Sequence, residues 1–446
     1  MFLSRPVSLL LLAAISLLPL AGCKNKNSPF VSPFDNVDAP TSGWGLRKLD
    51  PKDFPDMRTA WMDKSNLEKA IQKSLDFLQK NSSTRFYLSN NPGDSITHDQ
   101  VQASLIDVLD MLHRNISPDQ FQQQIMARYD VYTSVGYNGS GDVWFTGYFT
   151  PTYYGSSKKT PQYQYPVYSR PADLDSDPNT GQVRGDYPTR RELMGSGPRS
   201  LQGKNLELLW FKNPLEPFMI QVQGSAKVIL TDGTQVLVGY AGSNGREHKG
   251  LGTQLRDSGK IDPKHVSLPS VMAYFEQHPT ELDQYVLNDD RFTFLKIYTP
   301  EEAREWPTGS LNEQVTTDRS LATDKSIFPR ASLTFIDVPT PAANGTLLPH
   351  QGFMLDQDTG GGIRAAGRAD IYMGEGPDAG TRAGEEFAQG HLLYIFLKPE
   401  LVGTVRPGSA TILPSSAPRL PAPARTTTTT PRPATGGEMF PGAVRP

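Results

Sequence analysis

The sequence predicts an α+β protein that is mainly β, with helices near its N-terminus. Two observations support this prediction. Apolar side chains recur at helical spacing early in the chain, at Leu67, Ile71, Leu75 and Leu78, whereas later stretches alternate apolar and polar residues. The clearest alternation covers 227–238, where an Asp-Gly turn between two such runs predicts a β-hairpin.

The ends of the chain differ in composition from its middle. Arg5 precedes an apolar run, and Leu20-Ala21-Gly22-Cys23 follows it, as in a secretory signal that ends at residue 23. The run is shorter than the ~20 apolar residues that a membrane span needs. The four residues Leu20-Ala21-Gly22-Cys23 resemble the bacterial lipoprotein box. Because Cys23 is the only cysteine, no internal disulfide can form, and we expect lipid attachment there.

Polar, low-complexity segments follow the signal and close the chain. Residues 24–50 are expected to be a polar tether, and 403–446, rich in Pro and Thr, a disordered tail. Residues 51–402 lie between them, enough for two domains at ~100 to 200 residues each. The net charge of -3 and the lack of a concentrated Lys/Arg face argue against nucleic-acid binding.

Helix signals come first in the folded part. Ser65 with Glu68 predicts a capping box before the first stripe, and a second stripe runs from Val101 to Leu112. Ser117 before a proline predicts the start of a third helix.

Strands are predicted from about Asp142 onward. Alternation in 333–338 predicts one strand and 391–397 the last one, with a helix around 271–275 between the hairpin and these strands.

The most informative stretch is 358–364, Asp-Thr-Gly-Gly-Gly-Ile-Arg. Three consecutive glycines indicate positive φ or close approach of the backbone to another group. The stretch is interpreted either as a ligand site or as a tight loop between two strands with solvated aspartates. Asp324 precedes a predicted strand upstream, and Asp370 follows downstream, so three aspartates stand in order.

This order, with Asp358 in Asp-Thr-Gly-Gly and Asp370 in Asp-Ile-Tyr, resembles the three-aspartate barrel domain of the lytic murein transglycosylase A family. Residues 145–151, 214–225 and 239–245 are similar to further motifs of that family and occur in the right order.

The resemblance implies a double-psi β-barrel domain, discontinuous in sequence, from 51–152 and 290–402, with its three-aspartate segment at about 315–398. It also implies an inserted second β domain at 153–289 and a substrate groove between the two domains.

The activity that the resemblance implies is that of a lytic transglycosylase, a carbon–oxygen lyase that cleaves the β-1,4 bond between N-acetylmuramic acid and N-acetylglucosamine in cell-wall turnover. Its catalytic aspartate falls on Asp370, as general acid and then base, while the muramic acid's own hydroxyl closes a 1,6-anhydro ring. Asp370 must then be protonated when it acts as the acid. Arg368, two residues earlier on the same predicted strand face, either points away or binds substrate.

Supporting roles follow from the same resemblance. Asp358 and Asp324 are expected to hold the geometry of the site through hydrogen bonds to the backbone. The expected substrate-binding residues are Tyr148, Gln223, Gly224, Ser225, Gly360 and Gly361.

Four further polar residues are weighed from the sequence itself. Gln221 and Gln223 alternate in a predicted strand and so share a face, and the resemblance favours Gln223. Arg190 and Arg191 are interpreted as solvated charges outside the site.

The expected partners are peptidoglycan glycan strands and, through lipidated Cys23, a membrane, with cell-wall synthases or scaffolds as further candidates. We expect the outer membrane, on its periplasmic side. No cofactor is required, and the seven histidines lack ligand spacing, so no metal is indicated.

Three alternatives remain. Asp257-Ser258-Gly259 with Asp358-Thr359-Gly360 could form an aspartic-protease pair, although the flanks of Asp257 lack the apolar strand that such enzymes place there. A barrel of this type could also bind cell-wall glycans without cleavage, as in expansins. A muramidase would use Asp370 with a second carboxylate and release reducing ends.

Overall fold

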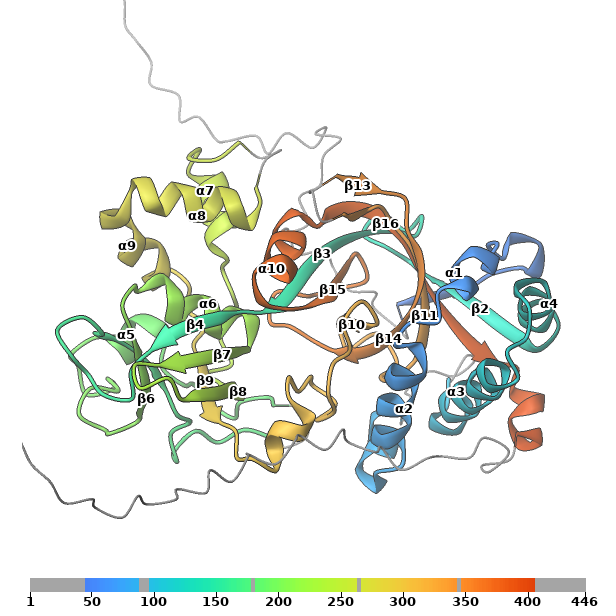
Figure 1. Ribbon diagram of the computed structural model, residues 1–446, viewed down its shortest axis with the longest axis horizontal. Coiled ribbons are helices and arrows are strands. Elements are labelled where there is room, and N and C mark those ends of the chain that lie inside the picture. The colour runs from blue at the N-terminus through green and yellow to red at the C-terminus, as the bar shows by residue number, and fades with distance from the viewer. Residues whose placement is uncertain (1–44, 88–95, 178–180, 263–265, 343–345, 406–446) are drawn as a thin grey trace, which may run out of the picture. The chain divides into compact units, whose positions relative to one another are not determined.

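The computed structural model describes residues 45–87, 96–177, 181–262, 266–342 and 346–405 (Figure 1). Cys23 and the signal therefore lie outside the described residues, as do most of the tether and all of the Pro/Thr-rich tail beyond residue 405. Within the described ranges, no helix combines the length and the apolar character that crossing a membrane requires.

Four α-helices form the N-terminal part: α1 (Arg58–Met62), α2 (Leu67–Leu78), α3 (His98–His113) and α4 (Pro118–Arg128). The sequence sets two of their starts. The Thr97 side chain caps α3 by accepting from the Gln100 N–H, and Ser117 and Gln120 form a reciprocal capping box before α4. The two predicted apolar stripes are thus confirmed as helices α2 and α3, and the predicted helix start at Ser117 is confirmed as the start of α4.

The predicted capping box at Ser65 is wrong. The residue before α2 is Asn66, in the left-handed region at φ 58°, and its side chain makes no capping hydrogen bond. Helix α2 instead depends on its buried apolar face, which includes Leu67, Ile71 and Leu75.

Eight strands form one sheet in the spatial order β1, β2, β16, β11, β14, β10, β15, β3. Their bounds are β1 (Leu46–Lys48), β2 (Tyr129–Ser134), β3 (Asp142–Thr150), β10 (Ser320–Ala322), β11 (Leu333–Asp337), β14 (Gln351–Asp358), β15 (Arg368–Glu375) and β16 (Phe387–Leu397). Strand β3 pairs with β15 in parallel and with β16 in antiparallel orientation. The six strands from β16 to β3 therefore close into a ring, and closure removes the free edges that a sheet otherwise exposes.

A second, four-stranded sheet pairs β4 (Thr152–Gly155), β7 (Ser225–Leu230), β8 (Gln235–Ser243) and β9 (Thr293–Ile297). The predicted hairpin is confirmed as β7 and β8, and its turn contains Gly233 at φ 84°. Two strand pairs are smaller: β5 (Tyr165–Tyr168) with β6 (Glu207–Phe211), and β12 (Thr340–Pro341) with β13 (Leu347–Leu348).

The remaining helices are α5 (Arg190–Met194), α6 (Leu215–Gln223), α7 (Leu251–Asp257), α8 (Leu268–Gln277), α9 (Leu282–Leu287) and α10 (Gly376–Glu385). Short 3₁₀ segments cover Pro51–Asp53, Asn81–Tyr87, Pro279–Glu281, Glu302–Glu305 and Pro399–Thr404. The helix expected around 271–275 is confirmed as α8.

Helix α6 corrects a prediction. Gln221 and Gln223 do not alternate on a strand but lie in the last turn of this helix. The Asn213 side chain accepts from the Leu215 N–H at its start, and Gly224 ends it at φ 78°, a left-handed conformation that suits glycine.

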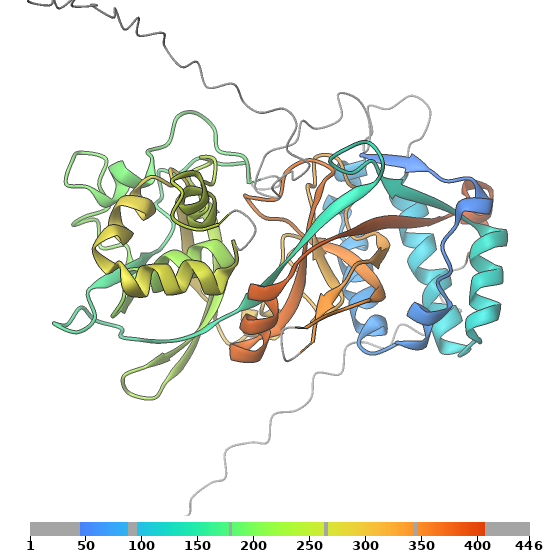
Figure 2. The ribbon, with the colours of Figure 1, turned by 90° about the horizontal axis from the view of Figure 1, so that it is seen from above.

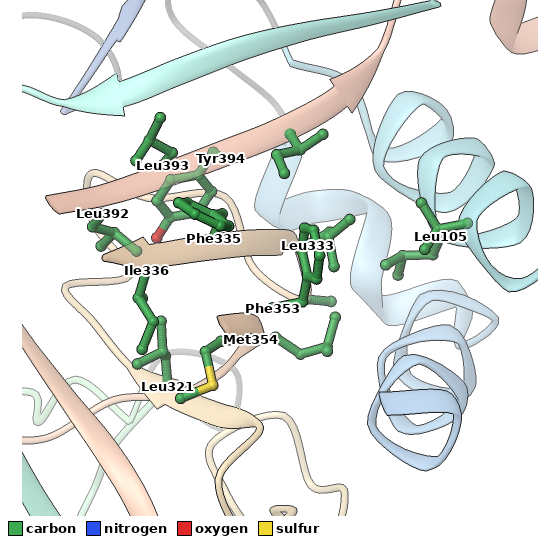
Figure 3. Close-up of a cluster of buried hydrophobic side chains, with 14 of the residues drawn as sticks. Leu105, Leu321, Leu333, Phe335, Ile336, Phe353, Met354, Leu392, Leu393 and Tyr394 are labelled. Carbon is green, nitrogen blue, oxygen red and sulfur yellow. The ribbon is translucent and has the colours of Figure 1, made fainter. Parts of the chain in front are cut away.

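The N-terminal helices and the strand ring share one hydrophobic core. Helices α2 and α3 pack on β14 and β16 (Figure 2). Leu105 of α3 belongs to the same cluster as Leu333 and Phe353 of the ring strands (Figure 3), and Trp61 stacks on Phe121 with ring centroids 3.9 Å apart. Full burial of one leucine or phenylalanine side chain contributes about 1.5–3 kcal/mol to stability. This core therefore fixes the strands that carry the candidate site.

Candidate active site

A cavity of about 390 Å³ is lined by β3, β15, the loop after β14, and helices α6, α8 and α10. It brings together segments that are far apart in the sequence. Six of the predicted site residues line it: Tyr148, Gln223, Asp358, Gly360, Gly361 and Asp370.

Asp370 lies on β15, directly opposite Thr146 on β3. Its Oδ1 accepts hydrogen bonds from the Thr146 hydroxyl and from Nη2 of Arg368, the latter at 3.0 Å. Arg368 therefore does not point away from Asp370. The guanidinium therefore stabilises negative charge that develops on this oxygen during a reaction. Both contacts use Oδ1, so Oδ2 is the oxygen available to a ligand.

Asp358 ends β14 and faces Tyr148. Its Oδ2 accepts from the Tyr148 hydroxyl at 2.9 Å, and its Oδ1 accepts from the backbone N–H groups of Ser310 and Thr359 at 2.9 and 2.8 Å. Burial raises the pKa of Asp358 even though these hydrogen bonds oppose the shift. The backbone hydrogen bonds are the kind predicted for a residue that holds the site's geometry.

Asp324 supports the site from outside the cavity lining. It is 5% exposed. Its Oδ2 accepts from the Ala365 N–H at 2.8 Å, and its Oδ1 accepts from the N–H and the hydroxyl of Ser326. Ala365 has φ 63°, a strained conformation for a residue other than glycine. The Asp324 carboxylate thus holds the end of the loop that carries the three glycines.

The glycine run is needed for close approach rather than for positive φ. None of Gly360, Gly361 and Gly362 is among the residues with positive φ in the described chain. A Cβ on Gly361 would lie 2.6 Å from Nε of Arg291, and one on Gly362 would lie 3.4 Å from Cδ2 of His248. The run therefore lets the loop pack against side chains from the segment between β8 and β9.

The predicted sugar-binding residues after α6 differ in position. Gln223 lines the cavity, and its Oε1 accepts from the Phe149 N–H at 3.1 Å. Gly224 caps α6, and Ser225 begins β7; neither is in the cavity lining.

The prediction that Arg190 is a solvated charge is wrong, whereas Arg191 is exposed as predicted. Arg190 is 3% exposed and lines the cavity. Its Nη1 donates to Oε1 of Gln221 at 2.7 Å, and its Nη2 lies 3.6 Å from Oδ2 of Asp289. Burial lowers the pKa of Arg190 to about 10, with Asp289 opposing the shift.

Asp289 also accepts from His248, whose Nδ1 lies 3.0 Å from Oδ2. His248, Asp289 and Arg291 all line the cavity, and sequence reasoning missed all three. Only folding brings the segments that carry these residues together, and no spacing in the sequence indicates the cluster.

A further carboxyl group in the cavity lining was not predicted. Glu386 follows α10 as its C-terminal cap residue and is 2% exposed. Neither of its carboxyl oxygens has a hydrogen-bond partner among the described residues. Burial raises the pKa of Glu386 to about 8, with the Arg382 guanidinium opposing the shift. Glu386 is therefore protonated near neutral pH.

This raised pKa predicts how stability depends on pH. An acid whose pKa is higher in the folded state stabilises the fold below its unfolded pKa and loses that contribution as pH rises through the folded pKa. For Glu386 the window runs from 4.5 to about 8. Glu386→Gln cannot ionise. Across this pH window the free energy of unfolding of the parent should therefore fall by roughly 4 kcal/mol relative to that of Glu386→Gln. Urea unfolding of both proteins at the two ends of the pH window measures this change. If the difference in free energy of unfolding were the same at both pH values, the raised pKa of Glu386 would be wrong.

The protease pairing is not supported by the arrangement. Asp257 ends α7, is absent from the cavity lining and pairs with Arg256, whose Nη2 lies 2.9 Å from its Oδ1. In the described ranges, no group of three His, Cys, Asp or Glu side chains is placed to hold a metal ion.

Two family models match the chain: an MltA specific insert domain over residues 144–296 and a 3D domain over residues 319–395. Together they span nearly all of the four-stranded sheet and of the ring strands, and the second includes Asp324, Asp358 and Asp370.

Curated relatives agree with these models. The chain is 28% identical over 259 residues to membrane-bound lytic murein transglycosylase A of Escherichia coli strain K12, covering 57% of this chain and 66% of the relative. It is 29% identical over 253 residues to the Vibrio cholerae protein of that name, covering 56% and 64%. The match thus spans just under two thirds of the length of each relative.

Solved structures share the fold. A membrane-bound lytic murein transglycosylase from Agrobacterium tumefaciens superimposes with a TM-score of 0.63 at 23% identity, covering 81% of this chain and 99% of that one. Escherichia coli MltA with bound chitohexaose gives 0.60 at 23% identity, covering 82% and 97%.

Proposed function

The chain belongs to the membrane-bound lytic murein transglycosylase A family, and on this premise we propose that it is a peptidoglycan lytic transglycosylase. It cleaves the β-1,4 bond between N-acetylmuramic acid and N-acetylglucosamine and leaves 1,6-anhydromuramic acid ends. The observation that carries this proposal is the cavity in which Asp370 lies beside Arg368 and Thr146, next to the Asp358–Tyr148 pair.

In the first step, protonated Asp370 donates its proton from Oδ2 to the glycosidic oxygen, and the bond from that oxygen to C1 of muramic acid breaks. Positive charge develops at C1. Arg368 and Thr146 already contact Oδ1, so they stabilise the carboxylate as it forms.

In the second step, the Asp370 carboxylate takes the proton from the 6-hydroxyl of the same muramic acid, and that oxygen attacks C1. The anhydro ring closes, Asp370 is protonated again, and no water is consumed. Asp358 orients Tyr148 toward the cavity through their hydrogen bond, with Gln223, Gly360 and Gly361 as further substrate contacts. Exclusion of water from C1 favours ring closure over hydrolysis.

The domain organisation belongs to the same proposal. The closed ring of six strands supports a double-psi β-barrel built from 51–152 and 290–402. The four-stranded sheet supports an inserted domain at 153–289, and the cavity, lined from both regions, supports a substrate groove between them.

The proposed location is the periplasmic side of the outer membrane, through lipidated Cys23. The relatives are named membrane-bound proteins, and the lipoprotein-like sequence before Cys23 supports an anchor of this kind. Radiolabelled palmitate should label the wild-type chain in cells, and Cys23→Ala should remove the label.

Release of soluble fragments from purified sacculi separates catalysis from binding. The full-length chain in detergent is expected to release muropeptides with time, in an amount that exceeds the enzyme concentration many-fold. A chain that sediments with the sacculi but releases nothing would be a glycan-binding barrel, and the proposed activity would be wrong.

A further inference from the structure

Glu386 is a buried acid that the proposed mechanism does not use. It is 2% exposed, it lines the cavity, and its two oxygens have no hydrogen-bond partner within the part of the chain that the structure describes. A buried polar group without a hydrogen-bond partner is unfavourable, so a ligand group that pairs with Glu386 gains binding free energy.

The surroundings of Glu386 are small and apolar. The end of α10 packs closely on its neighbours: a Cβ on Gly384 would lie 2.9 Å from Cδ of Pro269, and one on Gly147 would lie 2.6 Å from Cα of Ala383. Leu268 and Phe387 also line this part of the cavity. The wall therefore combines apolar surface with one carboxyl group.

Few charges face Glu386 from the elements packed around it. Arg382 on its own helix opposes the rise in pKa that burial causes, and it is also paired with Asp318 at 2.8 Å. Of the elements that α10 contacts, β3 carries only Asp142, α8 carries only Glu276, and β15 carries Arg368, Asp370 and Glu375. Arg368 and Asp370 contact each other, with Nη2 and Oδ1 3.0 Å apart.

A protonated carboxyl group in an apolar wall suits one kind of ligand group. Its O–H is a hydrogen-bond donor, so it matches the carbonyl oxygen of an amide. An acetamido group adds a methyl group that can contact the apolar wall. Resting on the proposed function, we infer that Glu386 forms the subsite for an N-acetyl group of the glycan and that its O–H donates to the acetamido carbonyl oxygen.

The test uses chitohexaose and its fully deacetylated counterpart as probes. Binding is measured by calorimetry on the full-length chain in detergent with Asp370→Asn as the parent background, so that no probe is cleaved. At a pH well below 8, adding Glu386→Leu should weaken chitohexaose binding about tenfold, which corresponds to ~1.4 kcal/mol. It should leave binding of the deacetylated hexamer unchanged.

The pH dependence gives a second readout that a purely structural role would not move. Ionised Glu386 loses its donor, so the parent's affinity for chitohexaose should fall about tenfold as pH rises through about 8. Glu386→Gln keeps a donor and an acceptor without titrating and should bind equally at both ends of the range. Exposed Glu385 is the matched control, and Glu385→Gln should behave as the parent.

Each outcome decides the inference. Equal losses for both probes, an unchanged chitohexaose affinity in Glu386→Leu, or a pH dependence that persists in Glu386→Gln would each overturn the N-acetyl subsite. These results would leave the proposed activity intact. A parent that binds no chitohexaose and a wild-type chain that releases no muropeptides would instead remove the proposed function itself.

Discussion

Asp370→Asn is expected to lower the rate of muropeptide release by about a thousandfold, in line with the 10²- to 10⁴-fold contribution of a general acid–base group. Asparagine keeps the size of the side chain and its hydrogen bonds to Thr146 and Arg368, but it cannot donate and recover a proton. Initial rates on purified sacculi, with circular dichroism to compare the folds, measure this effect.

Asp378 provides the matched control for this variant. It lies on α10 just after β15, is exposed and is absent from the cavity lining, so Asp378→Asn should retain the wild-type rate. If Asp370→Asn kept more than a tenth of the activity, another group would be the acid, and Asp358→Asn would show whether it is Asp358.

Asp356→Asn is expected to destabilise the fold by about 3–5 kcal/mol, because it leaves a buried cation without its counter-ion. Asp356 is fully buried and pairs with Lys325, whose side chain is 4% exposed. The hydroxyls of Thr323 and Tyr394 also donate to the same carboxylate at 2.9 Å. Urea unfolding followed by tryptophan fluorescence measures the change.

Two further variants distinguish the loss of the buried ion pair from a non-specific loss of stability. Glu375→Gln breaks a 3.0 Å ion pair with partly exposed Lys227 and should cost less than about 1 kcal/mol. The double variant Lys325→Met with Asp356→Leu removes both charges and should recover much of the loss. If Asp356→Asn were no worse than Glu375→Gln, the buried pair would not stabilise the strand that leads to Asp358.

Much of the fold could be predicted because local patterns and tertiary packing agree. The 227–238 hairpin has alternation and an Asp-Gly turn, and the structure forms it as β7 and β8. Helix α6 was missed because Gln221, Val222 and Gln223 also alternate. The stronger sequence signals for a helix were Asn213 before it and Gly224 after it. In the structure the Glu216 side chain accepts from the Asn213 N–H at 3.2 Å.

The candidate site could be predicted only where its residues stand in motifs. Asp358, Asp370 and Tyr148 belong to motifs and do line one cavity. Arg190 and Asp289 could not be found in this way, because their contact depends on packing between segments about a hundred residues apart. Glu386 was missed for a different reason: it is buried without a hydrogen-bond partner among the residues that the structure describes, a property that no sequence pattern encodes.

The mass of the products tests the central claim most directly. Purified peptidoglycan would be digested with the full-length chain in detergent, and the released muropeptides would be measured by mass spectrometry before any chemical reduction. The account predicts products lighter by one water than hydrolytic muropeptides, because the 6-hydroxyl of muramic acid and not water attacks C1. Products with free reducing ends would contradict it and would identify the protein as a muramidase.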